Sequence, residues 1–178
     1  LGVRYEDTEK NDGTNANPGN SKQDVSDSAT IIAAATTLNL GAGESLYASY
    51  NQGFSPVDAG SSASIEPEES DVYEVGYRKS TASGMFELIA FFNDYTQLIE
   101  TCLEAGGCTG STGSTTNKGA AEVKGIEFQY RVNDLFAAPQ MKGSGASTSS
   151  TRYPLIISGM LQDSEYKGQN SSYVGNSI

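Results

Sequence analysis

The feature that most constrains this chain is an alternation of apolar and polar side chains within residues 65–95. In its first half, Tyr73, Val75 and Tyr77 fall on one face, while charged or small residues fall between them. A period of two is typical of a β-strand with one apolar and one polar face. The small, polar stretch Ser80–Gly84 then provides a turn, with a glycine available for positive φ.

The second half of this segment predicts a partner strand. One of its faces is apolar and consists of Phe86, Leu88, Ala90 and Phe92. Its other face mixes Met85, Ile89 and Phe91 with polar residues, so the alternation is less clean. The two halves together predict an antiparallel hairpin with one continuous, aromatic-rich apolar face.

Similar patterns predict about seven strands in all. The cleanest alternation lies in residues 122–132, where Ile126, Phe128 and Tyr130 face one way and polar residues of both charge signs face the other. The remaining strands are expected over 1–5, 29–40, 45–54 and 153–162. In 29–40, alanine would permit a helix, but β-branched residues favour a strand.

The connections differ in length in a regular way. Short turns at 41–44 and 80–84 alternate with long polar loops at 7–28, 54–64 and 98–119. Short connections on one side and long ones on the other are typical of an outer-membrane β-barrel. The stretch 133–150 departs from this pattern, because it is long where a short turn is expected.

Composition excludes several function classes. The chain has 178 residues, 22 of them acidic and 11 basic, which gives a net charge of -11 and no basic surface for nucleic acid. It has no histidine, which removes a histidine general base or a His-based metal site. It also lacks an apolar run of about 18 residues, so no transmembrane helix is expected, although a spanning strand needs only about 9–11 residues.

Two groups of acidic residues are interpreted as solvent-exposed loop residues rather than as functional sites. Asp7, Glu9, Asn11 and Asp12 could hold a calcium ion, but Gly13 falls one place late for an EF-hand loop and the closing glutamate is absent. The cluster Glu66, Glu68 and Glu69 lies at a loop-to-strand junction, and nothing places a second acid opposite it, as a glycosidase would need. The sequence therefore predicts no catalytic residues, no metal site and no cofactor.

Three motifs in this order resemble the barrel of TonB-dependent outer-membrane receptors. The first combines Pro67-Glu68, Ser70, Tyr73-Glu74 and Gly76 with the aromatic strand that follows. The flanking segments 46–56 (LYASYNQGFSP) and 117–127 (NKGAAEVKGIE) are similar to strand ends of the same family. No single motif is specific, and their shared order carries the resemblance.

The resemblance implies an all-β fold, namely a segment of a large antiparallel transmembrane β-barrel with short periplasmic turns and long extracellular loops. Plugged transporters of this type have 22 strands, which residues 1–178 are too few to supply. We therefore expect a partial barrel domain, with the plug domain and the other strands absent and a possible chain gap within 133–152. The residues expected to face lipid are Tyr73, Val75, Tyr77, Phe86, Leu88, Phe128 and Tyr130.

The resemblance also implies a location in the bacterial outer membrane and uptake of a scarce nutrient, most often a ferric siderophore or similar metal chelate. The implied partners are membrane lipid, lipopolysaccharide, the chelate, and TonB through the absent N-terminal part. Loop residues expected to line the ligand vestibule are Phe54, Asp58, Tyr95, Glu100 and Glu104. At a bacterial surface, Cys102 and Cys108 are expected to form a loop disulfide, the alternative being two free thiols.

Two other interpretations stay open from sequence alone. A secreted all-β binding or adhesive module with a loop disulfide would fold without detergent. A porin-like barrel that transports nothing actively would lack a plug.

Overall fold

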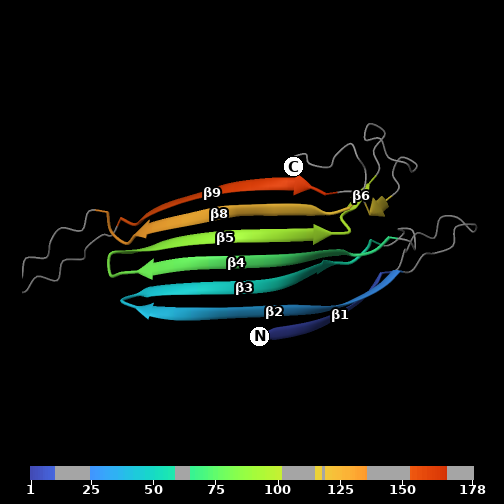
Figure 1. Ribbon diagram of the computed structural model, residues 1–178, viewed down its shortest axis with the longest axis horizontal. Coiled ribbons are helices and arrows are strands. Elements are labelled where there is room, and N and C mark those ends of the chain that lie inside the picture. The colour runs from blue at the N-terminus through green and yellow to red at the C-terminus, as the bar shows by residue number, and fades with distance from the viewer. Residues whose placement is uncertain (11–24, 59–64, 102–114, 118, 136–152, 168–178) are drawn as a thin grey trace, which may run out of the picture.

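A computed structural model describes residues 1–10, 25–58, 65–101, 115–117, 119–135 and 153–167. Seven of its strands form one antiparallel sheet in the order β1-β2-β3-β4-β5-β8-β9, and β6 and β7 form a separate two-stranded sheet (Figure 1). The strands are β1 (Gly2–Lys10), β2 (Val25–Gly41), β3 (Glu44–Ser55), β4 (Glu68–Ser80), β5 (Gly84–Thr96), β6 (Ile99–Thr101), β7 (Thr115–Asn117), β8 (Ala121–Val132) and β9 (Leu155–Tyr166). The predicted meander of about seven strands is thus confirmed.

Two tight turns, between β2 and β3 and between β4 and β5, lie at one end of the sheet. Between β2 and β3 the backbone has positive φ at Gly41, Ala42 and Gly43, with values of 88°, 51° and 79°. Gly43 also lies against the next turn, because its carbonyl accepts a hydrogen bond of 2.8 Å from the Ser80 N–H. A Cβ at Gly43 would lie 2.1 Å from the Ser80 carbonyl oxygen, so only glycine fits this junction.

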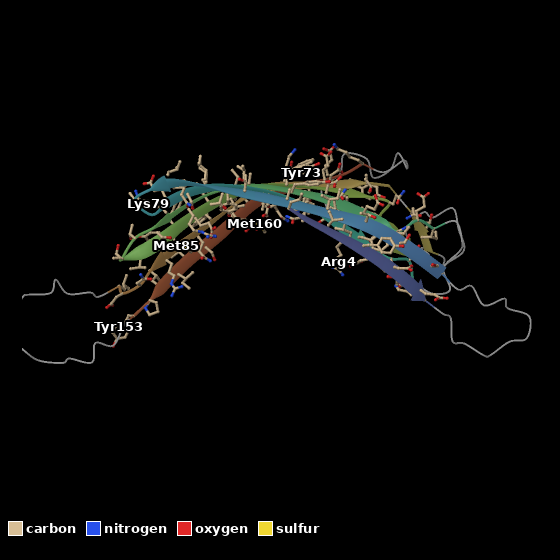
Figure 2. All side chains as sticks on the ribbon, turned by 90° about the horizontal axis from the view of Figure 1, so that it is seen from below. Arg4, Tyr73, Lys79, Met85, Tyr153 and Met160 are labelled. Atoms are coloured by element: carbon tan, nitrogen blue, oxygen red, sulfur yellow. The ribbon has the colours of Figure 1, made fainter. Side chains whose placement is uncertain are left out.

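The sheet is a single arched layer rather than half of a sandwich. Figure 2 shows Tyr73 and Lys79 on its convex side, and Arg4, Met85 and Met160 on its concave side. Among the described residues only Val57 and Ala121 are buried apolar side chains, so no packed core exists in this part of the chain. No helix in the described ranges has the length and apolar character that crossing a membrane requires.

The structure corrects several predicted boundaries. The loop predicted over 7–28 is too long, because β1 runs to Lys10 and β2 begins at Val25. The loop predicted over 98–119 contains the short strands β6 and β7, which have three residues each, too few to show an alternating pattern. The last strand covers 155–166 rather than 153–162. The possible chain gap falls mostly on 136–152, outside the described residues.

Candidate functional site

The convex face of the sheet collects the apolar side chains. Because antiparallel partners point to the same side of a sheet, the register assigns each residue to a face. Tyr73, Val75 and Tyr77 of β4 oppose Phe92, Ala90 and Leu88 of β5, and the convex positions of β8 continue these rows. All seven residues expected to face lipid share this face: Tyr73, Val75, Tyr77, Phe86, Leu88, Phe128 and Tyr130.

These convex side chains are open to the surroundings. Val75 is 59% exposed and Leu161 is 80% exposed, although both lie in the middle of long strands. Nothing in the described part of the chain covers them. Each large aliphatic or aromatic side chain left in water forfeits about 1.5–3 kcal/mol, so this face requires an apolar environment from outside the sheet.

Charged residues limit the apolar band at both ends. On β4 the convex face reads Asp71, then Tyr73, Val75 and Tyr77, then Lys79. The two charges are separated by about 26 Å along the strand, at roughly 3.3 Å per residue. With the strands tilted by roughly 35°, this length corresponds to a band about 22 Å high. Outer-membrane barrels have an apolar band of roughly 25 Å.

The loop-side limit of the band shifts steadily across the sheet. The first charged convex residue is Asp7 on β1, Asp71 on β4 and Asp163 on β9. Following the paired residues across the sheet from β1 to β9 places Asp7 six residue positions nearer the loop end than Asp163. The strands β1 and β9 are six strand spacings apart. The limit of the band therefore moves by one residue, about 3.3 Å, for each strand spacing of about 4.8 Å. This slope means that the strands are tilted by roughly 35° from the direction perpendicular to the band. Membrane barrels tilt their strands by about this amount.

Aromatic rings cluster at both sides of this band. Near the loop side, the Tyr73 ring centroid lies 5.0 Å from that of Tyr50 and 6.2 Å from that of Phe92. Near the turn side, the ring centroids of Tyr77 and Phe86 are 6.5 Å apart. On β4, each cluster lies next to a charged residue that limits the band, Asp71 beside Tyr73 and Lys79 beside Tyr77.

The concave face carries a polar network toward the turn end. The Glu87 carboxylate accepts hydrogen bonds from the Tyr47 hydroxyl at 3.1 Å and from Arg78 Nε at 3.0 Å. The Arg78 guanidinium also lies 5.7 Å from the centre of the Tyr47 ring. Gly76 makes this arrangement possible, because a Cβ there would lie 2.2 Å from Tyr47 Cζ.

The rest of the concave face is mixed rather than wholly polar. On β3 and β4, Ser49 donates a hydrogen bond of 3.0 Å to Glu74. On β9, however, Ile156 and Met160 are 57% and 51% exposed on this side. The concave face therefore offers both charged and apolar contacts to whatever lies inside the curve of the sheet.

Side-chain bonds tie the connections together at the loop end. Lys10 Nζ lies 3.0 Å from Asp58 Oδ1, and the Val57 N–H donates to Asp27 Oδ2 at 2.9 Å. Lys167, just beyond β9, pairs with Glu122, and the hydrogen bond from this carboxylate raises the pKa of the Lys167 ammonium. These contacts hold segments that are far apart in sequence at one rim.

The structure separates the residues expected to line a vestibule. Tyr95 lies on the concave face at the loop end, opposite Ser70 and Ala121. Asp58 follows β3 and is paired with Lys10. Phe54 falls on the convex face by its register opposite Glu69, so the structure does not bring it to the same side as Tyr95. Glu100 is in β6, and its side chain is outside the described set.

Glu104, Cys102 and Cys108 lie outside the described residues, so the structure does not bear on the expected disulfide. No group of three or more His, Cys, Asp or Glu residues in the described ranges has a geometry that could hold a metal ion. Asp7 and Glu9, considered above for a calcium loop, are part of strand β1.

A family model described as "TonB dependent receptor-like, beta-barrel" matches residues 1–178. The chain belongs to this family. No curated protein matches it. TonB-dependent receptors are transporters of the bacterial outer membrane and not enzymes, and their uptake is energised through TonB. Family membership thus confirms the resemblance and decides against the secreted module.

Two features of this receptor segment escaped the sequence patterns. The first is the Tyr47–Glu87–Arg78 network, whose members lie on three strands that only the register brings together. The second is a hydrogen-bonded cluster around Asn117 at the loop end. The only sequence signal for the second was the position of Asn117 at the start of a family-like motif.

Proposed function

We propose that this chain forms part of the wall and outer rim of a TonB-dependent receptor that takes up a ferric siderophore or a similar metal chelate. In this proposal the convex face contacts acyl chains and lipopolysaccharide, and the concave face lines the interior. The observation that carries it is the exposed apolar band, which is limited by charges at both ends and inclined to the strands by roughly 35°.

The proposal includes more strands and a plug domain outside residues 1–178. In the described sheet the outer edges of β1 and β9 have no strand partner. Hydrocarbon contains no water to satisfy such edges, so membrane sheets close into barrels. Further strands would pair with both edges, and a plug inside the barrel would contact the concave face. TonB would engage the receptor through the N-terminal part that precedes the barrel.

The ligand would bind at the loop end. Tyr95 and Asp58 would contribute from the described residues, together with Glu100 and Glu104, and Phe54 is the weakest candidate because it lies on the convex face. We also propose that Cys102 and Cys108 form a disulfide in this region. The net charge of -11 suits an anionic chelate poorly unless divalent cations held by lipopolysaccharide offset it.

The test is an uptake measurement on the full-length receptor in outer membranes of intact cells. Cells would receive ⁵⁵Fe(III) bound to hydroxamate, catecholate or citrate chelators, with and without a protonophore that removes the energy source. Uptake of one chelate that depends on both the receptor and the proton gradient would support the proposed ligand class. If none of the three is taken up while another nutrient is, the ligand class is wrong although the family assignment stands.

A further inference from the structure

A single side chain joins three separate segments at the loop end of the sheet. The Asn117 amide oxygen accepts a hydrogen bond of 2.7 Å from the Glu66 N–H, and its amide nitrogen donates to the Glu66 carbonyl at 2.7 Å. The same nitrogen donates to the Gln97 carbonyl, also at 2.7 Å. The Asn117 amide thus pairs with Glu66 as a strand backbone would, and binds the end of the β5 segment in addition.

The partners fix the orientation and the identity of this side chain. All three are backbone groups, one N–H and two carbonyls, so the amide nitrogen has to face the carbonyls. Aspartate would present an oxygen to both carbonyls and lose both donated bonds. Glutamine would be one methylene too long for the same pairing.

Neighbouring contacts reinforce the same junction. The Ile99 N–H donates to Glu68 Oε1 at 2.6 Å, and the Gln97 side-chain amide donates to the Glu66 carboxylate. The Leu98 N–H donates to the Gly119 carbonyl at 3.0 Å. Gln97 itself has a φ of 55°, a left-handed backbone conformation that these bonds hold in place.

The junction lies where the β6–β7 sheet meets the main wall. β6 follows β5 after a short break, and β7 ends at Asn117 before the chain returns to β8. Figure 1 shows β6 at the end of the sheet where β5 ends and β8 begins. Among the described residues, the other side-chain bonds between this region and the 65–68 segment are those that join Ile99 to Glu68 and Gln97 to Glu66.

We propose that Asn117 is a positioning residue that locks the β6–β7 hairpin to the outer ends of β4 and β5. The outer rim then meets its ligand as a preformed surface, which lowers the ordering cost of binding. The first part rests on the bonds described above. The second part, that the rim binds ligand, rests on the proposed function.

Hydrogen exchange on the full-length receptor tests the lock without any ligand. In Asn117→Ala all three bonds are lost, and exchange at the Glu66 and Ile99 amides should rise by about tenfold. In Asn117→Asp the Glu66 N–H keeps an acceptor, but the two donated bonds are lost and a carboxylate faces two carbonyls, so exchange at the Ile99 amide should rise by more than in the alanine variant. If Asn117 only filled space, the isosteric aspartate would be the milder change, and this order of effects would overturn the proposal.

Asn133 provides the matched control. Its side-chain amide donates to the Ala82 carbonyl at 3.0 Å, at the opposite end of the sheet. Asn133→Asp should accelerate exchange at the turn end and leave Glu66 and Ile99 unchanged. Faster exchange at Glu66 in this variant as well would mean general loosening of the fold, which contradicts a local lock.

Uptake of the ⁵⁵Fe(III) chelates tests the second part. Asn117→Ala should raise the half-saturation concentration severalfold and leave the maximal rate unchanged, because energised transport does not involve the lock. A fall in maximal rate alone would contradict a preformed binding surface. If the wild-type receptor takes up no ferric chelate, the proposed ligand fails, while hydrogen exchange still decides the lock.

Discussion

The assignment of the convex face to lipid can be tested at two neighbouring positions of β5. Leu88 and Ile89 are both large aliphatic residues, and they point to opposite faces of the same strand. Leu88 opposes Tyr77 and Phe128 in the apolar band, whereas Ile89 opposes Gly76 and Glu127 on the concave side. Replacing either by arginine removes a similar apolar side chain and adds the same charge.

The expected costs differ because the environments differ. Arginine at the lipid-facing midplane of a membrane barrel costs about 2–4 kcal/mol, and loss of the leucine adds about 1 kcal/mol, since part of that side chain faces its neighbours. For Leu88→Arg we expect a loss of roughly 3–5 kcal/mol in unfolding free energy. On the concave side, the new guanidinium of Ile89→Arg would lie opposite the Glu127 carboxylate, which offsets part of the lost packing. The expected loss there is about 1 kcal/mol.

Urea unfolding of the full-length receptor in phosphatidylcholine vesicles measures both losses. The difference of about 3 kcal/mol corresponds to roughly a hundredfold change in the unfolding equilibrium. If Ile89→Arg destabilises the receptor as much as Leu88→Arg, the two faces have similar surroundings and the lipid assignment is refuted. Repeating the measurement with a polar, uncharged glutamine at each position would show whether charge or lost packing dominates.

Two further changes probe the wall itself. Gly76→Ala puts a Cβ 2.2 Å from the Tyr47 ring and should lower the unfolding free energy, measured in urea, by about 1–3 kcal/mol. In the control Gly2→Ala the nearest atom to the new Cβ lies 3.9 Å away, so stability should change by less than about 0.5 kcal/mol. Equal effects of the two variants would contradict the close packing of Tyr47 on Gly76. The raised pKa of Lys167 stabilises the folded state while the ammonium is charged, so this contribution is present below the ordinary value of 10.5 and is lost as pH rises through the folded value. Lys167→Met should therefore flatten the alkaline fall in stability, and an unchanged profile would show that the pair with Glu122 contributes nothing.

The faces of the strands were predictable because they depend only on a local period of two. Tyr73, Val75 and Tyr77 share a face in any β-strand, whatever the strand pairs with. The hairpin over 65–95 followed from the same rule and a turn rich in small residues. The count of seven strands in the main sheet also followed, because polar loops and turns interrupt the alternating segments.

The ends of the strands were harder to predict, since they extend beyond the apolar band. Val25, Ser26 and Asp27 belong to β2 although they fall in the predominantly polar stretch that predicted a loop over 7–28. Strands of this sheet continue past the apolar band, where most residues on both faces are polar and the alternation is lost. The strands β6 and β7 were missed because each has only three residues, too few to show a period of two.

Register is the information that sequence patterns lack, and three glycine positions show why it matters. Gly76, Gly125 and Gly159 each lie directly opposite an aromatic residue, namely Tyr47, Phe91 and Phe128. In each pair the ring covers the glycine so closely that a Cβ would lie within 2.6 Å of it. A ring of this kind covers backbone that the glycine leaves bare, which stabilises the strand and fixes its pairing. A slip by one residue would place a side chain under every ring and turn the apolar face inward. The glycines that weaken each strand in isolation therefore help select the one register in which the apolar band is continuous.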